Sequence, residues 1–424
     1  MDKEFKTVSW APDSNIYEVN LRQYTKEGSF RSFANHLPRL REMGIEILWF
    51  MPITPISLEG RLGSLGSYYA CADYMNTNPE FGTIADFTWL VSQAHGFGFK
   101  VLIDWVANHT GRDHIWTKEH PEYYRKNIDG QFYDAHGWAD VIDLNFDIPE
   151  LRSDMIRAMQ FWVETCGIDG FRCDMAMLVP LDFWKEARTS LDRIKSLFWL
   201  AECEEIMYHE VFDASYAWKW LHGAESYWKQ TSDMQGLFQI LYYYHHQFPA
   251  TALRAFFTSN HDENSHSGSE CERMGDAAVP FAVFSCLYSG LPLIYSGQEL
   301  PNKKRLLFFD KDEINWDTPC SLSGFYKTLL QLRKNNQALK GGDSVTAPVI
   351  LSNTAEERIL SFIRRGNGDE VLVVINLSPE EQSVIITGQP LAGSFSNVFN
   401  PDEDQFISGQ PIRLPAWGYR VYVK

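Results

Sequence analysis

The chain has 424 residues, 38 basic and 55 acidic side chains, a formal net charge of −17 and a hydrophobic content of 45%. This hydrophobic content excludes an intrinsically disordered chain. The acidic balance argues against a nucleic-acid partner, because such a partner requires a basic face. The length fits one large domain with a smaller one, or two to three ordinary domains.

No apolar run reaches the roughly 18 residues of a membrane span, so we expect no membrane partner. The first residues contain no apolar segment of signal-peptide length, and we therefore expect a cytoplasmic protein, or an exported one whose signal has been removed. The seven cysteines form no Cys-x-x-Cys pair. This argues against a disulfide framework and a structural zinc site. The sequence carries no signal for an oligomeric state.

Short β-rich runs alternate with helical apolar patterns up to about residue 340. The helical patterns have apolar residues at helical spacing and often end at a glycine, as in 87–96 and 155–167. Eight strands, each followed by helical material, predict parallel βα units that close into a (β/α)8 TIM barrel. A doubly wound open sheet is the alternative, since periodicity does not separate the two. The predicted strands are 15–20, 45–50, 100–104, 170–174, 197–201, 214–216, 255–259 and 293–296.

Two stretches break this rhythm. Residues 109–145 form a loop rich in His, Trp, Tyr and Asp, and a long loop after a barrel strand is usually functional. Beyond residue 343, strands are predicted at 357–364, 370–376, 382–386 and 419–423, separated by turn residues. We therefore predict a barrel over 1–108 and 146–342, a short inserted domain over 109–145 after the third strand, and a C-terminal antiparallel β-sandwich domain over 343–424.

Polar side chains gather where four predicted strands end. One charged residue at a strand end is commonly a solvated or capping group. Four such ends that meet at one barrel mouth predict a catalytic site, because buried strand ends are poor places for unpaired charge. The residues are Asp104, Asn108 and His109, then Arg172 and Asp174, then Glu202, and finally Asn260, His261 and Asp262.

Three carboxylates with an arginine and two histidines suit glycoside hydrolysis, which needs a proton donor on the leaving oxygen and a carboxylate near the anomeric carbon. Arg172 precedes Asp174 by two residues and so shares its face of the strand. A guanidinium there keeps the carboxylate ionised and oriented, as a nucleophile requires. The acid must hold its proton near neutral pH, and neighbouring carboxylates raise the pKa of Glu202 in that direction.

These motifs resemble those of the α-amylase family of retaining α-glycosidases, glycoside hydrolase family 13. Residues 104–109 resemble its first motif, 170–174 the nucleophile motif, 201–202 the acid/base segment and 259–262 the motif with the third carboxylate. Residues 16–19, 48–53, 290–299 and 414–419 resemble further family segments. The resemblance therefore covers nearly the whole chain, with its motifs in the family's order.

The resemblance implies a role for each site residue. Asp174 is the nucleophile, Glu202 the general acid and base, and Asp262 the third catalytic carboxylate, which grips sugar hydroxyls. The implied substrate-binding residues are Tyr69, which stacks on the sugar, Asp104, which braces the site, His109 and His261, which hydrogen-bond the same sugar unit, and Arg172, which orients the nucleophile.

The implied function is hydrolysis of α-1,4 bonds in starch, glycogen or maltooligosaccharides through a covalent glycosyl-enzyme intermediate. A transglucosylase or α-glucosidase of the same family is the alternative. A non-catalytic relative that serves as a scaffold is a third reading, but the chain keeps all three carboxylates. Met177 and Leu178 stand where many starch-cutting members have Lys-His, which changes the contacts on the leaving-group side of the cut bond.

No cofactor is required for this reaction, and calcium is left open. Asn108 and Asp143 align with two ligands of the family's calcium site, and oxygen ligands suit that ion. The short insert offers no further ligands, and the two residues are equally explained as hydrogen-bonding the loop to the barrel. Four tryptophans have aromatic faces that stack on sugars, although core packing is the commoner use of tryptophan; they are Trp116, Trp138, Trp218 and Trp220.

Overall fold

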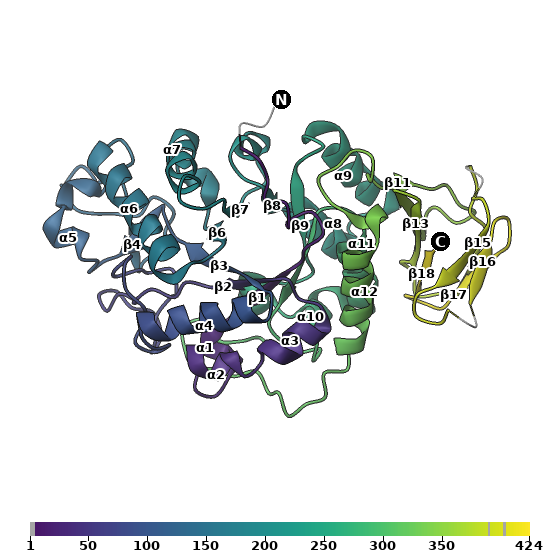
Figure 1. Cartoon of the computed structure of the whole chain (residues 1–424), viewed down its shortest axis with the longest axis horizontal. Helices are drawn as coiled ribbons and strands as arrows, with labels where there is room; N and C mark the ends of the chain where they lie inside the picture. Colours follow the sequence, from purple (N-terminus) through teal and green to yellow (C-terminus); the bar gives the residue numbers. More distant parts are fainter. Residues whose placement is uncertain (1–4, 389–390, 402–403) are drawn as a thin grey trace.

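The computed structural model describes residues 5–388, 391–401 and 404–424. Eight parallel strands close into a barrel in the order β1-β10-β9-β8-β7-β6-β3-β2, surrounded by helices (Figure 1). The closed barrel excludes the open doubly wound sheet. The strands are β1 (Ile16–Val19), β2 (Ile47–Phe50), β3 (Lys100–Trp105), β6 (Gly170–Cys173), β7 (Phe198–Ala201), β8 (Ala214–Tyr216), β9 (Leu253–Phe256) and β10 (Leu291–Tyr295).

The seventh predicted strand is displaced. It was expected over 255–259, whereas β9 covers Leu253–Phe256. Residues Phe257 and Thr258 continue the buried run without belonging to the strand, which explains why hydrophobicity alone extends it too far. The polar residues 260–262 consequently lie in the loop beyond β9, where their side chains are free to turn toward the centre of the mouth.

Helices form where apolar residues recur at helical spacing. In α6 (Pro149–Cys166), Met155, Met159 and Trp162 share the buried stripe, and Gly167 closes the helix in the left-handed conformation with φ 72°. The other helices of the barrel are α1 (Leu21–Tyr24), α2 (Phe30–Ala34), α3 (Leu37–Met43), α4 (Ile84–Gly96), α7 (Leu181–Leu191), α8 (Trp218–Trp228), α9 (Met234–Gln247), α10 (Glu270–Met274), α11 (Ala278–Leu287) and α12 (Ser323–Asn335). Among the residues described, no helix has the length and apolar character needed to cross a bilayer.

The insert after β3 is ordered around a small hairpin. Strands β4 (His109–Gly111) and β5 (Val141–Asp143) pair antiparallel, and the helix α5 (Trp116–Glu119) lies between them in sequence. Because β4 begins immediately beyond the end of β3, the hairpin holds His109 at the barrel mouth.

The C-terminal strands form a six-stranded antiparallel sheet and a separate two-stranded pair. Their apolar faces share a core that includes Ile359, Ile363, Val384 and Leu414. This domain lies at the opposite end of the molecule from the insert, so it is remote from the hairpin that carries His109 (Figure 1). The large sheet has the order β11 (Val349–Ile350), β12 (Ile359–Gly366), β13 (Asp369–Asn376), β18 (Tyr419–Val423), β15 (Ser394–Asn397) and β16 (Gln405–Ile407), and the pair is β14 (Gln382–Val384) with β17 (Ile412–Leu414).

Candidate active site

The barrel brings the predicted polar residues to one mouth, because the carboxyl ends of parallel strands meet there. A cavity of about 480 Å³ opens at this mouth. Five of the predicted site residues line it: Tyr69, His109, Asp174, Glu202 and Asp262. The other three, Asp104, Arg172 and His261, are buried and are absent from the cavity lining.

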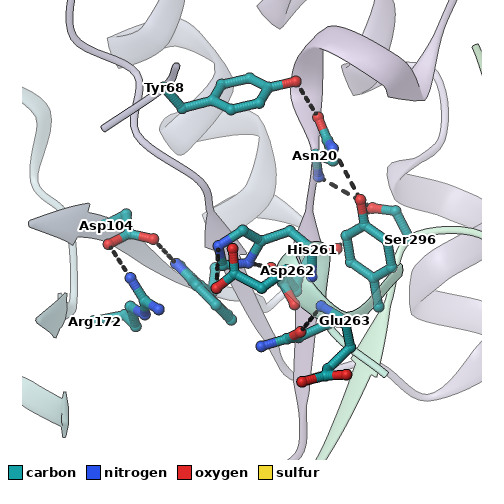
Figure 2. Close-up of polar contacts among 12 residues, drawn as sticks. Asn20, Tyr68, Asp104, Arg172, His261, Asp262, Glu263 and Ser296 are labelled. Atoms are coloured by element: carbon teal, nitrogen blue, oxygen red, sulfur yellow. Dashed lines mark hydrogen bonds and ion pairs between the residues drawn. The ribbon is translucent and has the colours of Figure 1, made fainter. Parts of the chain in front are cut away.

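Arg172 connects three carboxylates beneath the cavity floor. Its Nη1 donates to Asp104 Oδ1 at 2.8 Å and to Asp174 Oδ1 at 3.0 Å. Its Nη2 lies 2.9 Å from Glu202 Oε2 as an ion pair without hydrogen-bond geometry. Figure 2 shows the contact with Asp104. Because Arg172 is fully buried, its charge is not screened by water, and the surrounding carboxylates compensate it.

The two carboxyls at the cavity floor hold protons more tightly than they do in water. Burial raises the pKa of Asp174 to about 7, against the opposing effect of Arg172. Burial likewise raises the pKa of Glu202 to about 7. We expected Arg172 to keep Asp174 ionised, but burial has a larger effect on the pKa of Asp174 and acts in the opposite direction. We expected neighbouring carboxylates to raise the pKa of Glu202, and they do, but burial is the larger cause. Both carboxyls therefore change protonation state near neutral pH, and the charge of Asp174 is one of the effects that raise the pKa of Glu202.

His261 is held by a chain of buried hydrogen bonds. Its Nδ1 lies 2.5 Å from Glu18 Oε1, and its Nε2 lies 2.6 Å from the hydroxyl of Tyr69. That hydroxyl donates to Asp104 Oδ2 at 3.1 Å. Burial lowers the pKa of His261, but Asp262 and Glu18 outweigh it and raise this pKa to about 9. At neutral pH the imidazolium therefore donates from both nitrogens to protein groups.

The side chain of His261 is 1% exposed and packs on Tyr69, with the two rings nearly parallel at 5.4 Å. Its contact with the sugar, which the resemblance implies, stays a prediction. His109 does line the cavity, and burial lowers its pKa to about 4, so its ring is neutral.

Two residues at the site were missed by sequence reasoning. Glu18 is fully buried in β1. A charged residue in an otherwise apolar strand is the sequence signal that could have identified it. Met175 has φ 39° and ψ 48°, a left-handed conformation that is uncommon for methionine. In this conformation the backbone N–H of Met175 donates to Glu202 Oε2 at 2.9 Å. No local sequence pattern predicts this hydrogen bond.

The four tryptophans differ in whether they pack in the core or line the cavity, where a sugar could stack on them. Trp116 and Trp220 are buried in the core. Trp138 lines the cavity and packs against His109 at 5.2 Å between ring centres, which makes it available to a sugar. Trp218 is partly buried against the core.

The two residues aligned with the family's calcium site keep oxygen atoms that suit a cation. Asp143 Oδ2 accepts from the backbone of Ala135, whereas its Oδ1 is buried without a hydrogen-bond partner. The Nδ2 group of Asn108 lies 3.4 Å from His109 Nδ1, a contact that does not involve the amide oxygen of Asn108. Across residues 5–388, 391–401 and 404–424, no three His, Cys, Asp or Glu side chains are grouped to hold a metal ion.

Comparison with known proteins agrees with this geometry. Residues 12–139 and 124–318 match the model of the alpha amylase catalytic domain, and residues 350–413 match the alpha amylase C-terminal all-beta domain. The chain belongs to the alpha-amylase family.

Relatives within the alpha-amylase family cover most of the chain. The alpha-amylase MalA of Haloarcula japonica is 27% identical over 90% of this chain, which spans 58% of that relative's length. The structure of a maltogenic alpha-amylase of Thermotoga neapolitana, described as noncanonic, superposes with a TM-score of 0.89 at 29% identity over 97% of this chain and 98% of that one. An alpha-amylase of Lactobacillus plantarum superposes with a TM-score of 0.88 at 28% identity over 97% and 99%.

Proposed function

We propose that this protein is a retaining α-glucan hydrolase that cleaves α-1,4-glucosidic bonds of starch, glycogen or maltooligosaccharides. The observation that carries the proposal is the contact of one buried arginine, Arg172, with Asp104, Asp174 and Glu202 directly beneath a cavity. This geometry supports Asp174 as the nucleophile and Glu202 as the acid of glycoside hydrolysis with retention, because both line one cavity together with Asp262.

The first step transfers the sugar to the protein. The ionised Asp174 attacks the anomeric carbon while the glycosidic C–O bond breaks, and Glu202 gives its proton to the leaving oxygen. The raised pKa values are compatible with this division, because both carboxyls titrate near pH 7 and a state with Asp174 ionised and Glu202 protonated is populated there. The product is a covalent glycosyl–Asp174 ester and a free aglycone.

The second step releases the sugar. Glu202, now ionised, takes a proton from water, and the water oxygen attacks the anomeric carbon and expels the Asp174 carboxylate. Tyr69, His109 and Asp262 line the cavity around the position of this sugar, and Arg172 orients Asp174 from below. No step requires a metal ion, and we propose none.

The function is tested by the product profile on maltoheptaose and soluble starch. We expect the wild-type protein to release shorter maltooligosaccharides, and Asp174→Asn to lose activity by orders of magnitude. Glu202→Gln removes the proton donor and is expected to lower kcat by about 10²–10⁴-fold. Glu205→Gln, an exposed glutamate three residues further on, is the matched control and should retain activity.

Each other product pattern selects a different function. Products longer than the substrate identify a transglucosylase, in which a sugar replaces water in the second step. Glucose alone identifies an α-glucosidase. Absence of any reaction, or near-normal activity of Asp174→Asn, contradicts the proposal.

A further inference from the structure

A strap of residues 57–66, in the loop after β2, spans the barrel mouth from the insert to the loop after β10. At its insert end, the backbone N–H groups of Leu58 and Glu59 donate to Asp113 Oδ2 at 3.0 and 3.3 Å. At its other end, the N–H of Ser64 donates to Asp310 Oδ1 at 2.7 Å, and the N–H of Leu65 donates to the carbonyl of Phe309 at 2.9 Å. The strap therefore bridges the insert after β3 and the loop after β10, which lie on either side of β1 and β2 in the barrel order.

Buried side chains that follow β1 fix the strap to the loop after β10. Arg22 is fully buried and donates through Nη1 to the carbonyls of Gly66 at 3.0 Å and Phe308 at 3.3 Å. Gln23 Nε2 donates to the carbonyls of Leu307 at 2.6 Å and Asp310 at 2.8 Å. These bonds satisfy buried polar groups, so opening the junction carries the cost of leaving them unpaired.

The same junction is reinforced at the end of β1. Asn20 accepts from the hydroxyl of Tyr68, in the loop after β2, at 2.9 Å. Its Nδ2 donates to the hydroxyl of Tyr295 in β10 at 2.8 Å, and its backbone N–H donates to Ser296 Oγ at 3.2 Å. Figure 2 shows Asn20 between Tyr68 and Ser296. One residue thus joins the strands on both sides of β1.

The strap and the loop after β10 are in direct contact. A Cβ atom at Gly63 would lie 2.5 Å from Phe309 Cβ and 2.9 Å from the Phe309 carbonyl oxygen. Gly63 also has φ 61°, which disfavours any other residue. A saccharide chain has no room to pass between the two segments at this point.

This junction lies opposite the proposed acid. In the barrel order, β7 is four strands from β1 in either direction, and the loops after β2 and β10 flank β1. Glu202 follows β7. Since the acid protonates the leaving oxygen, the leaving part of the substrate lies on the Glu202 side, and the retained part extends toward the strap.

Apolar side chains line the cavity at this place. Leu62 of the strap lines the cavity together with Phe308 and Phe309 of the loop after β10, and we call these three the end wall. The ring of Phe308 is nearly parallel to that of Tyr69, with an angle of 12° and 6.3 Å between centres. The end wall therefore continues the surface on which the first sugar would rest.

We propose that the strap makes the cavity a blind pocket, so that the enzyme takes the non-reducing end of an α-glucan and releases a short oligosaccharide from that end. This rests on the proposed function and names its substrate more closely: chain ends rather than internal bonds. An open cleft would instead let the chain continue past the retained sugars.

The test compares two maltoheptaosides that carry a p-nitrophenyl label at the reducing end. One is unmodified, and the other is blocked by a 4,6-O-ethylidene group at the non-reducing end. Chromatography of the labelled products follows both. We expect the first to be shortened from its unlabelled end, and the blocked one to be cleaved at least about 100-fold more slowly because the end wall rejects the added group.

Equal cleavage of the two substrates would overturn the blind pocket while leaving the proposed function intact. Cleavage of neither would contradict the proposed function and remove this inference with it. The two failures are therefore distinguishable in one assay.

A variant of the end wall tests whether its side chains cause the slow cleavage of the blocked substrate. Leu62→Ala combined with Phe309→Ala shortens two of its side chains and should raise the blocked-to-unblocked rate ratio at least about tenfold. The control is Leu307→Ala, which should leave that ratio unchanged. Leu307 is exposed, lies in the loop after β10 like Phe309, and does not line the cavity. An unchanged ratio in the folded double variant would overturn the role of the end wall.

Discussion

Glu18 and His261 share a buried hydrogen bond between β1 and the loop after β9, with 2.5 Å between Glu18 Oε1 and His261 Nδ1. The bond fixes the imidazole whose other nitrogen contacts the hydroxyl of Tyr69. Through this bond, a strand residue that is remote from the cavity positions a side chain that lines it. Glu18 is therefore a positioning residue in the site.

Glu18→Gln should lower the pKa of His261. This pKa is now about 9, because Asp262 and Glu18 outweigh the effect of burial, while Arg172 opposes them. Stability from the protonated ring is full below about pH 6.5 and is lost as the pH rises through about 9. In the variant this loss should begin at lower pH. Histidine NMR titration and melting temperatures from pH 6 to 9.5 measure the change.

The control for this prediction is Glu299→Gln. Glu299 is buried and accepts hydrogen bonds from Tyr17 and Arg39, on the opposite side of β1 from His261. Its substitution should lower overall stability without moving the His261 titration. Equal titration shifts in the two variants would show that the Glu18 contact has no specific effect.

The rate of hydrolysis should have a bell-shaped dependence on pH. Asp174 and Glu202 both have pKa values raised to about 7, first by burial. At low pH both are protonated and the nucleophile is lost, whereas at high pH both are ionised and the acid is lost. We expect kcat/KM to fall above about pH 7. A profile that stays level to pH 9 would contradict the paired titration.

Asp174→Asn should increase stability at alkaline pH. Four buried carboxylates (Glu18, Asp104, Asp174 and Glu202) and the partly exposed Asp262 face two buried cations, Arg172 and His261. If all of these groups are charged, the negative charges exceed the positive ones by three. Because the folded pKa of Asp174 lies above its ordinary value, stability from its neutral form is lost as the pH rises through about 7. The variant should melt higher at pH 8, with a smaller difference at pH 5.

The control is a carboxylate whose pKa is lowered by folding, so that its substitution should change the melting temperature in the opposite direction. Asp86 accepts from Thr83 at the start of α4, and these hydrogen bonds lower its pKa to about 2. Asp86→Asn should therefore lower the melting temperature at pH 8. If both variants melted lower at pH 8, ionised Asp174 would not be a source of instability.

Removal of divalent cations should leave activity and melting temperature unchanged. We base this expectation on the grouping of ligands: across the described residues, no three His, Cys, Asp or Glu side chains are grouped to hold a metal ion. Dialysis against EDTA followed by assay and thermal unfolding measures this. A loss that calcium restores and magnesium does not would identify a calcium site in the insert.

Gly170→Ala should destabilise the barrel next to the site. A Cβ atom there would lie 2.0 Å from the carbonyl oxygen of Phe198 on β7, and backbone atoms have little freedom to move. We expect a cost of about 1–3 kcal/mol from overpacking, together with reduced activity because Arg172 lies two residues further along β6. Gly96→Ala is the control, since a Cβ atom at the end of α4 meets nothing within 4 Å. It should stabilise by about 0.4–1 kcal/mol, and chemical denaturation compares the two.

Most barrel strands, and the polar residues that follow them, could be predicted from the sequence, whereas the strand predicted over 255–259 lies at Leu253–Phe256. A short apolar run bounded by polar or turn residues indicates a buried strand, and this local pattern was sufficient to predict β3, β6 and β8. Arg172 and Asp174 were expected on one face because side chains repeat every second residue along a strand, and they are in contact. The family motifs added the roles of the carboxylates.

Which of these residues line the cavity could not be predicted from the sequence, because it depends on contacts between distant segments. Glu18 meets His261 across 243 positions of sequence, and the strap meets Phe309 through a backbone bond to Leu65. No local pattern encodes such contacts, because they depend on barrel closure and on the conformation of loops. Burial follows from the same closure, and it is the largest of the effects that raise the pKa of Asp174 against the opposing charge of Arg172.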